Sequence, residues 1–178
     1  MRVITGSARG MSLKTLEGES TRPTSEKVKE AVFSAIQFEI EGRSVLDLFA
    51  GSGQLGIEAL SRGAAYACFV DSGKQAIGII RSNVEKTGFT ASSRICQMDY
   101  LGFLRMNTQK FDIVFLDPPY QSDMLLKSLA EVGAFVNPGG SVIAEHPTEV
   151  TLQDEFGELK KYRSYKYGKT SVTIFRKG

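Results

Sequence analysis

The chain carries short apolar runs separated by amphipathic stretches. Several runs have the length of buried strands and are bounded by polar or glycine residues: 45–48, 67–71, 94–98, 111–116 and 141–145. Between them, apolar residues recur at the spacing of one helical face: 57–60, 74–86, 101–104 and 124–132. Strands that alternate with helices predict a parallel, doubly wound sheet. In a sheet ordered 3-2-1-4-5, the first and fourth strands are neighbours where ligands bind.

The closing segment departs from this alternation. Residues 159–167 and 170–176 read as two strands joined at Gly168-Lys169 with no helix between them, which predicts an antiparallel hairpin. A parallel sheet that ends in such a hairpin resembles the class I methyltransferase fold. We therefore predict an α/β, Rossmann-like fold of the class I S-adenosylmethionine-dependent methyltransferases, with a seven-stranded, mostly parallel sheet.

The N-terminal residues precede this core. Residues 2–13 read as a short hairpin around a turn, and Thr24 or Ser25 is placed to cap the helix that follows. We expect residues 1–41 to cover one end of the sheet and residues 43–178 to form the Rossmann-like core. A length of 178 residues suits one methyltransferase domain.

Composition adds little that is specific. An apolar content of 42% and a charged content of 24% are ordinary for a soluble globular protein. Cys68 and Cys96 lie in apolar strands, which favours buried free thiols over a disulfide or a metal site. The N-terminus lacks an apolar signal core and no stretch is long enough to cross a bilayer, so we expect a cytoplasmic protein without a membrane partner. A net charge of +2 is uninformative as a total.

Gly51, Gly53 and Gly56 form a G-x-G-x-x-G turn between the first strand and the helix after it. Bare backbone lets a ligand come close, and this arrangement is typical of a nucleotide-cofactor cradle. Several cofactor classes satisfy the turn alone. Asp47 narrows the choice, because a carboxylate there would repel a dinucleotide pyrophosphate and attract the ammonium and sulfonium groups of S-adenosylmethionine. The alternative is that Asp47 caps the turn.

Two further carboxylates follow the next two strands. Asp71 closes the second strand and is placed to accept hydrogen bonds from the ribose hydroxyls of an adenosine. NAD and S-adenosylmethionine share that contact, so Asp71 supports the cradle without choosing the ligand. The alternative is a solvated acid at a strand end. Asp99 follows the third strand, where it could accept from the adenine amino group.

Residues 117–120, Asp-Pro-Pro-Tyr, follow the fourth strand and give the second strong signal. Pro118 and Pro119 fix the backbone and lack N–H donors, which leaves their carbonyls facing the cleft. The Asp117 carboxylate and the Pro118 carbonyl can accept the two N–H groups of an exocyclic base amine and aim its lone pair at the methyl group. Tyr120 offers a ring on which the base stacks. Catalysis would then rest on positioning, with Asp117 taking the released proton; the alternative is a rigid turn without chemistry.

The motif from residue 47 to residue 63, together with Asp-Pro-Pro-Tyr, resembles the RsmD family of 16S ribosomal-RNA guanine-N2 methyltransferases. The similarity covers nearly the whole chain, through Arg9-Gly10-x-x-Leu13, Arg22-Pro23-Thr24, Lys29-Glu30, Glu145-His146 and Tyr167-Gly168. It implies S-adenosylmethionine as the methyl donor and a guanine amine as the acceptor. Many members have Glu at Asp71 and Phe at Tyr120, differences that leave the roles intact. We assign the cofactor to Asp47, Phe49, Gly51, Ser52, Gly53, Asp71 and Asp99, and catalysis to Asp117, Pro118 and Tyr120.

The expected substrate contacts are mostly basic. The closing hairpin, 160–169, carries lysines and an arginine without any acid, and tyrosines lie between them. This pattern is typical of RNA contact, although edge strands also use lysines merely to block aggregation. Arg22 could reach a phosphate, brace Asp117 or be an ordinary surface arginine. His146, the single histidine, is expected to pack in a loop, and no metal site is expected. The substrate-binding set is Arg9, Arg22, Pro119, Lys160, Lys161 and Arg163.

We therefore predict a methyltransferase that modifies a guanine N2 amine as a monomer on ribosomal RNA or the small ribosomal subunit. The nearest alternative is an adenine-N6 methyltransferase on DNA or RNA, since Asp-Pro-Pro-Tyr can serve that amine too. Against DNA, no added domain is available to flip a base out of a duplex. A nicotinamide-dependent oxidoreductase is disfavoured by Asp47 and by the lack of a substrate domain. A non-catalytic RNA-binding protein is disfavoured by the intact Asp-Pro-Pro-Tyr.

Overall fold

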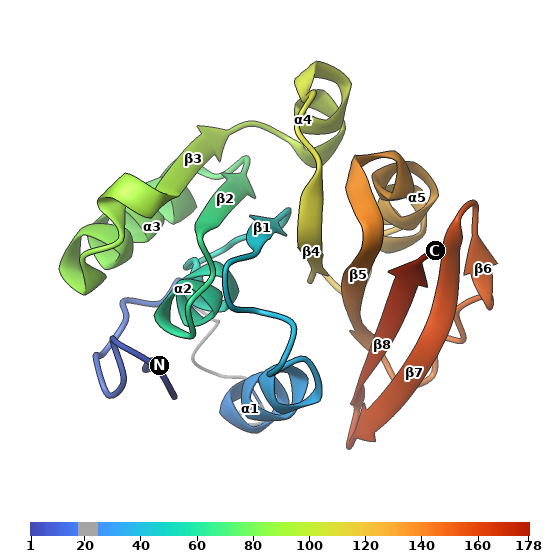
Figure 1. Ribbon diagram of the computed structural model, residues 1–178, viewed down its shortest axis with the longest axis horizontal. Helices are drawn as coiled ribbons and strands as arrows, with labels where there is room; N and C mark the ends of the chain where they lie inside the picture. The colour runs from blue at the N-terminus through green and yellow to red at the C-terminus, as the bar shows by residue number, and fades with distance from the viewer. Residues whose placement is uncertain (18–24) are drawn as a thin grey trace.

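The computed structural model describes residues 1–17 and 25–178 and is built around one mixed sheet (Figure 1). The strands are β1 Ser44–Asp47, β2 Tyr66–Asp71, β3 Ser93–Gln97, β4 Phe111–Leu116, β5 Val136–Pro147, β6 Glu155–Phe156, β7 Leu159–Tyr167 and β8 Thr170–Lys177. Their order across the sheet is β3-β2-β1-β4-β5-β8-β7-β6. The first five in this order pair in parallel, and β8, β7 and β6 continue the sheet with antiparallel pairing.

The structure confirms the predicted fold class and the order 3-2-1-4-5 of the parallel strands. The predicted count of seven strands is wrong, because the sheet has eight. The additional strand, β6, consists of Glu155 and Phe156, which pair with Lys160 and Leu159 of β7. A strand this short shows no alternation of apolar and polar residues, so the hydrophobic pattern carries no sign of it.

Helices cover both faces of the sheet, and each face has its own apolar core (Figure 1). One face packs against α1 Ser25–Ala35, α2 Gln54–Ser61 and α3 Lys74–Thr87, and the other against α4 Tyr100–Met106 and α5 Met124–Val132. Strand residues alternate between the cores: Val45 and Ile113 belong to the first, Leu46 and Val114 to the second. Because Val45 pairs with Ile113, β1 and β4 reach the same edge of the sheet with their carboxyl ends.

Residues 137–140, Asn-Pro-Gly-Gly, have the composition of a turn but lie inside β5, which begins at Val136. The register between β4 and β5 shifts near this point. A Cβ atom on Gly140 would lie 2.8 Å from the carbonyl oxygen of Asp112. The Pro-Gly-Gly residues therefore form an irregular step within the strand, where glycine allows the neighbouring backbone to come close.

The N-terminal arm folds back on itself as the predicted short hairpin and is fastened to α2. Its strand-like pairing in the described residues is one antiparallel bridge between Arg2 and Ser12. The backbone N–H groups of Ile4 and Thr5 donate to the two carboxylate oxygens of Glu58 at 2.9 and 3.0 Å. A side chain of α2 thus binds the N–H groups of the two residues that follow the paired part of the arm.

Glu58 is the centre of a buried group of charges that holds this arm. Its carboxylate lies 3.5 Å from Lys29 Nζ and 3.0 Å from Arg62 Nε. Lys29 also donates to the carbonyl of Arg2 at 2.8 Å, so the arm, α1 and α2 are joined at one point. Burial lowers the pKa of Lys29, and the neighbouring Glu58 carboxylate opposes that shift. Charges buried to this degree are kept in proteins when they are paired.

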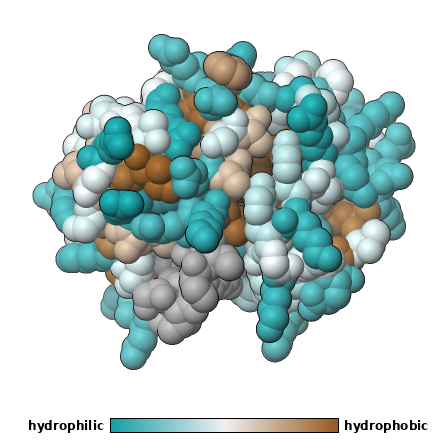
Figure 2. Space-filling view, turned by 90° about the horizontal axis from the view of Figure 1, so that it is seen from below, coloured by the Kyte–Doolittle hydropathy of each residue, from teal (hydrophilic) through white to brown (hydrophobic). Residues whose placement is uncertain are grey.

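The predicted start of the first helix falls partly outside the described residues, where Thr24 and Arg22 lie. From Ser25 onward the helix is present, and its face buries Val28 and Val32 as the spacing predicts. Within the described residues, none of the helices has both the length and the hydrophobicity to cross a membrane. The face shown in Figure 2 is mainly hydrophilic, with apolar residues gathered in a few patches.

Candidate cofactor and acceptor site

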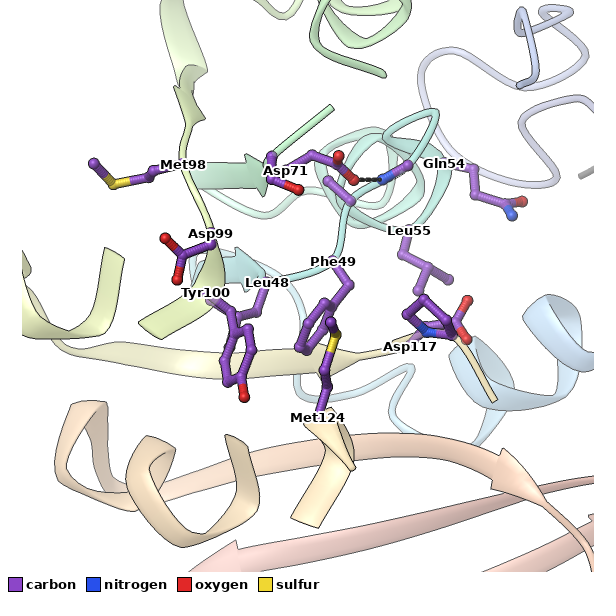
Figure 3. Close-up of a pocket in the computed structure, with 14 residues that line it drawn as sticks. Leu48, Phe49, Gln54, Leu55, Asp71, Met98, Asp99, Tyr100, Asp117 and Met124 are labelled. Atoms are coloured by element: carbon purple, nitrogen blue, oxygen red, sulfur yellow. Dashed lines mark hydrogen bonds between the residues drawn. The ribbon is translucent and has the colours of Figure 1, made fainter. Parts of the chain in front are cut away.

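A cavity of about 510 Å³ opens where β1, β2, β3 and β4 end (Figure 3). We call it the cofactor cavity. Its walls come from segments that are far apart in sequence but meet at the edge of the sheet where the topology predicts a ligand site. The predicted site residues among its lining are Phe49, Gly51, Asp71, Asp99, Asp117 and Pro119.

The glycine turn forms one wall of this cavity. Gly51 and Gly53 have φ angles of 57° and 82°, in the left-handed region that favours glycine. The Gly51 N–H donates to Asp71 Oδ2 at 2.9 Å, which fastens the turn to the end of β2 (Figure 3). A Cβ atom on Gly56 would lie 2.4 Å from Phe69 Cε1. The glycines therefore shape the turn and let α2 pack closely on the sheet.

Asp71 and Asp99 both line the cavity and both bind backbone groups. Asp71 Oδ1 accepts from the N–H of Gly73 at 2.8 Å, in addition to the bond from the glycine turn. Asp99 Oδ1 caps α4 by accepting from the N–H of Gly102 at 2.9 Å. A carboxylate has about four acceptor sites, so these bonds orient the two groups without saturating them. Their contacts with ribose and adenine stay predictions.

Asp47 lies behind the glycine turn and is not among the residues that line the cofactor cavity. Its side chain is buried, and its Oδ2 accepts from the N–H of Gly56 at 3.2 Å. Ser52 and Gly53 also lie outside the lining, and Ser52 is fully buried. The structure thus shows the capping alternative for Asp47. Its contact with a ligand ammonium, like those of Ser52 and Gly53 with the cofactor, stays a prediction.

The Asp-Pro-Pro-Tyr motif separates the cofactor cavity from a second cavity of about 160 Å³, which we call the acceptor cavity. Asp117 lines the cofactor cavity, and Pro118 and Tyr120 line the acceptor cavity. Pro119 lines both. The four residues therefore form a wall between the two cavities. A motif that presents a methyl acceptor to a bound methyl donor is expected to lie between the two in this way.

The ring of Tyr120 is held in this wall by its hydroxyl group. The hydroxyl donates to Glu145 Oε1 at 2.8 Å and lies 2.8 Å from Thr170 Oγ1. Burial raises the pKa of Tyr120, and the Glu145 carboxylate raises it further, so the hydroxyl stays protonated. Sequence reasoning missed both partners. Thr170 comes from the first position of β8, and nothing in the sequence pattern connects it to the motif.

Apolar side chains form much of the cofactor cavity and were not predicted, apart from Phe49. The rings of Phe49 and Tyr100 lie with their centroids 5.2 Å apart and Met124 lies beside them, while Met98 lines the cavity from a separate place beyond Asp99 (Figure 3). Met98 and Tyr100 flank Asp99 in the sequence, and that proximity was the available signal. Their residue types are those of any apolar core, so the pattern could not separate them from it.

The two strands of the closing hairpin are long, so its basic residues lie at opposite ends of the strands of the sheet. At one end, Tyr167 pairs with Thr170, and Thr170 pairs with Pro147 at the carboxyl end of β5. This is the edge where the cavities open. Lys160 and Lys161 lie at the start of β7, at the opposite edge.

The structure does not bring Lys160 and Lys161 to the site. Lys161 Nζ donates to Asp154 Oδ1 at 2.8 Å, and Lys160 Nζ lies 4.0 Å from Glu155. The acids come from the segment just before the hairpin, which explains why a basic run without acids seemed unpaired in the sequence. The structure places these two lysines away from the two cavities, beside acids, and their binding to RNA stays a prediction.

Arg163 and Arg9 are not among the residues that line the two cavities. Arg163 stacks on Tyr162, with its guanidinium carbon 5.3 Å from the ring centroid. Arg9 is exposed and lines a separate hollow between the N-terminal arm and α1. Arg22 lies outside the described residues. For Arg9, Arg22 and Arg163, binding to RNA stays a prediction.

His146 is part of β5 and does not pack in a loop as expected. Its Nε2 lies 2.9 Å from Thr173 Oγ1 and its Nδ1 lies 3.0 Å from the carbonyl oxygen of Pro147. Burial lowers its pKa. Across residues 1–17 and 25–178, no group of three or more His, Cys, Asp or Glu side chains is arranged to hold a metal ion.

The sheet order and the places of the two motifs define a class of protein. A parallel β3-β2-β1-β4-β5 sheet, β8 inserted between β5 and β7, a glycine turn after β1 and Asp-Pro-Pro-Tyr after β4 make a Rossmann-like methyltransferase fold of class I. The solved structure named "Putative methyltransferase yhhF from Escherichia coli" has the same fold, with a TM-score of 0.87 at 26% identity, over 99% of this chain and 97% of that one.

The family described as "Conserved hypothetical protein 95" matches residues 1–176. The chain is 42% identical over 182 residues to "Putative rRNA methyltransferase YlbH" of Bacillus subtilis, which covers 99% of each protein. It is 35% identical over 133 residues to "Ribosomal RNA small subunit methyltransferase D" of Haemophilus influenzae, which covers 73% of this chain and 69% of that protein. The chain belongs to this family, the RsmD family that its motifs predict.

Proposed function

We propose that the protein is an S-adenosylmethionine-dependent methyltransferase that modifies the exocyclic N2 amine of a guanine in small-subunit (16S) ribosomal RNA. The observation that carries this function is the Asp-Pro-Pro-Tyr motif, which stands between a cofactor cavity of about 510 Å³ and an acceptor cavity of about 160 Å³. The names of the relatives YlbH and RsmD support ribosomal RNA as the substrate.

The charges of the cofactor cavity suit S-adenosylmethionine better than a dinucleotide. Among the described residues, the charged side chains that line it are the carboxylates of Asp71, Asp99 and Asp117. A pyrophosphate would face these groups without a basic partner, and like charges repel strongly at low local dielectric. Bound S-adenosylmethionine supplies a methyl group on a positively charged sulfur. These residues therefore disfavour the nicotinamide-dependent alternative.

The chain holds such a cofactor through groups of complementary chemistry. Asp71 and Asp99 line the cavity, and the proposal assigns Asp71 to the ribose hydroxyls and Asp99 to the adenine amino group, both of which are donors that a carboxylate can accept from. The apolar wall of Phe49, Met98 and Tyr100 suits the adenine ring and excludes water from it. The glycine turn provides bare backbone beside these groups.

Asp117 and the Pro118 carbonyl orient the acceptor amine. An ionised carboxylate and a carbonyl are acceptors only, so together they take the two N–H groups of an exocyclic amine. This draws the nitrogen lone pair out of conjugation with the base and points it toward the cofactor cavity. Asp117 then takes the proton that the amine releases. Methyl transfer needs little other acid–base help, so holding the reactants in line supplies most of the rate.

Tyr120 supplies the stacking surface for the base. Its hydroxyl is held by Glu145 and Thr170, so the ring is fixed before the base arrives. Stacking of a base on an aromatic side chain contributes about 1–3 kcal/mol to single-stranded recognition. A ring that is already oriented avoids part of the entropy cost of binding.

We propose that RNA phosphates bind at the turn of the closing hairpin and not at its far end, where Lys160 and Lys161 lie. Lys166 and Lys169 are exposed and lie next to the turn, at the edge where the cavities open. Thr148 fixes this turn, because its N–H donates to the carbonyl of Lys169 and its hydroxyl to the carbonyl of Gly168, both at 3.0 Å. The turn therefore presents two lysines on a fixed backbone.

We further propose that residues 1–178 act as a single methyltransferase domain and that the protein binds its RNA as a monomer. The substrate is either bare 16S RNA or the small ribosomal subunit, which would place the reaction in the cytoplasm. Both forms of the substrate contain single-stranded segments, and proteins that recognise specific RNA bases mostly bind such segments.

The test is a map of ribosomal RNA modifications by mass spectrometry in a strain that lacks the gene. The proposed function predicts the loss of one N2-methylguanosine from 16S RNA and its return when the gene is restored. Loss of an N6-methyladenosine would favour the alternative acceptor instead. An unchanged 16S RNA map would refute the function.

A further inference from the structure

Glu145 comes from a different strand than the catalytic motif but lies beside it. In the ladder between β4 and β5, Leu116 pairs with Ala144, so Asp117 and Glu145 are the next residues of two neighbouring strands. Leu116 and Ala144 face the core beneath α4 and α5. Because side chains alternate along a strand, Glu145 of β5 faces the other side of the sheet from Ala144, and Asp117 follows the last residue of β4. The charges of both carboxylates act on the Tyr120 hydroxyl, which lies near them.

Contacts hold the Glu145 carboxylate beside Tyr120, and both residues line the acceptor cavity. Its Oε1 accepts from the Tyr120 hydroxyl at 2.8 Å, and that hydroxyl is also bound to Thr170 at 2.8 Å. Glu145 lines the cavity together with Pro118 and Pro119. A carboxylate has about four acceptor sites, so the bond from Tyr120 fixes the group and does not by itself saturate it.

Guanine and adenine differ at the ring nitrogen beside the exocyclic amine. In guanine, N1 carries a hydrogen and is a donor next to the N2 amine. In adenine, N1 carries a lone pair and is an acceptor next to the N6 amine. Enzymes that act on an exposed base read this edge with hydrogen bonds. A site with two neighbouring carboxylates matches the two neighbouring donors of guanine.

We propose that Glu145 determines the base specificity by accepting the N1–H of the acceptor guanine, while Asp117 accepts from its exocyclic amine. This assignment rests on the proposed function and adds to it the residue that selects guanine. An adenine in the same place would set a lone pair against a group that can only accept. Sites built to bond a polar group of the substrate reject an analogue without that group by about 10⁴–10⁵-fold.

The test compares guanine with 2-aminopurine at the methylated position. 2-Aminopurine keeps the amine on C2 but has a lone pair on N1. The position is first mapped, and 16S RNA is then ligated around a synthetic segment that carries either base. Wild-type protein, Glu145→Gln and Thr170→Val are assayed on this RNA, both bare and assembled with small-subunit proteins. The readout is the ratio of kcat/KM for guanine to kcat/KM for 2-aminopurine.

The expected result is a strong preference of the wild-type protein for guanine and a fall of the ratio by at least tenfold in Glu145→Gln. The glutamine amide can donate to the lone pair of 2-aminopurine, so the rate on that base should rise while the rate on guanine falls. Thr170→Val removes one partner of Tyr120 and keeps the carboxylate. It should slow both substrates alike and leave the ratio unchanged, which separates reading of the base from positioning of the ring.

Thermal melting of each protein shows whether a change in activity comes from a folding defect, and a second variant, Glu145→Asp, serves as a control. Glu145→Asp keeps the carboxylate and should keep the preference for guanine. An unchanged ratio in folded Glu145→Gln, or an equal fall in Thr170→Val, overturns the role of Glu145 while the proposed function stands. A wild-type protein that does not methylate guanine at all overturns the proposed function itself.

Discussion

Replacing both lysines of the hairpin turn, Lys166 and Lys169, by alanine is expected to weaken RNA binding in a salt-dependent manner. Both side chains are exposed and lie at the edge where the cavities open. Each phosphate contact to a single strand contributes about 0.7 to the slope of log affinity against log salt concentration. Loss of two contacts should therefore reduce the magnitude of that slope by about 1.4.

The matched control removes two lysines from the other end of the same strand. Lys160→Ala with Lys161→Ala changes the net charge equally but acts at the opposite edge, where the acids Asp154 and Glu155 are the partners. The salt slope should stay at the wild-type value. Because Lys161 also donates to the carbonyl of Leu152 at 2.7 Å, this control should lower stability by about 1 kcal/mol.

The assay is fluorescence anisotropy of a labelled 16S RNA fragment that contains the methylated position, titrated at several potassium chloride concentrations. Thermal melting of each variant shows that the compared proteins are folded. The reasoning from strand register would be refuted if both double variants reduced the slope equally. It would also fail if the loss of Lys166 and Lys169 left the slope unchanged.

Three further changes test the site and its frame. Asp117→Ala should reduce methyl transfer by about 10²–10⁴-fold and leave calorimetric binding of S-adenosylhomocysteine within a few-fold, and full activity would remove Asp117 from the reaction. Gly56→Ala should cost about 1–3 kcal/mol in chemical denaturation, because the new Cβ would overlap Phe69, whereas Gly78→Ala, with open space around it, should not destabilise. Burial lowers the pKa of His146, so its contribution to the free energy of unfolding should be complete above the ordinary histidine pKa of about 6.5 and should fall as the pH drops below that value. His146→Gln should make the free energy of unfolding less dependent on pH in this range. An unaltered pH profile in that variant would show that other groups cause the dependence.

Much of the frame was predictable because the relevant signals are local. The apolar runs that became β2 and β4 have the length of strands, and the glycines at 51, 53 and 56 mark the turn behind β1. The acids Asp71 and Asp99 stand at strand ends, so the parallel topology alone carries them to one edge. The place of the cofactor cavity was predictable for the same reason, because ligands of such sheets bind at the carboxyl ends of the strands.

Other features depend on contacts between distant segments and could not be read from the pattern. The Asp47 carboxylate accepts from the Gly56 N–H of α2, and a carboxylate that binds the backbone has the same position in the sequence as one that binds a ligand. Glu58 accepts from the N–H groups of Ile4 and Thr5, so the N-terminal hairpin is bound to α2, a contact across more than 50 residues that the hydrophobic pattern does not indicate.

The strand pairing of the basic hairpin could not be predicted from the sequence either. A run of lysines gives no sign of which end of a strand reaches the site. The pairing of Tyr167 with Thr170, at the carboxyl end of β5, shows that the turn end of the hairpin is the one that lies near the cavities. Thr170 in turn binds the Tyr120 hydroxyl, a contact that joins the last strand to the Asp-Pro-Pro-Tyr motif across 50 residues of sequence.

The most direct test of the central claim is the identity of the methylated nucleoside. Purified protein is incubated with S-adenosylmethionine carrying a labelled methyl group and with small subunits, or bare 16S RNA, from a strain that lacks the gene. The RNA is digested to nucleosides, which are separated and identified by mass spectrometry. The account predicts that the label appears in N2-methylguanosine; label in N6-methyladenosine, or no transfer to either form of the RNA, would contradict it.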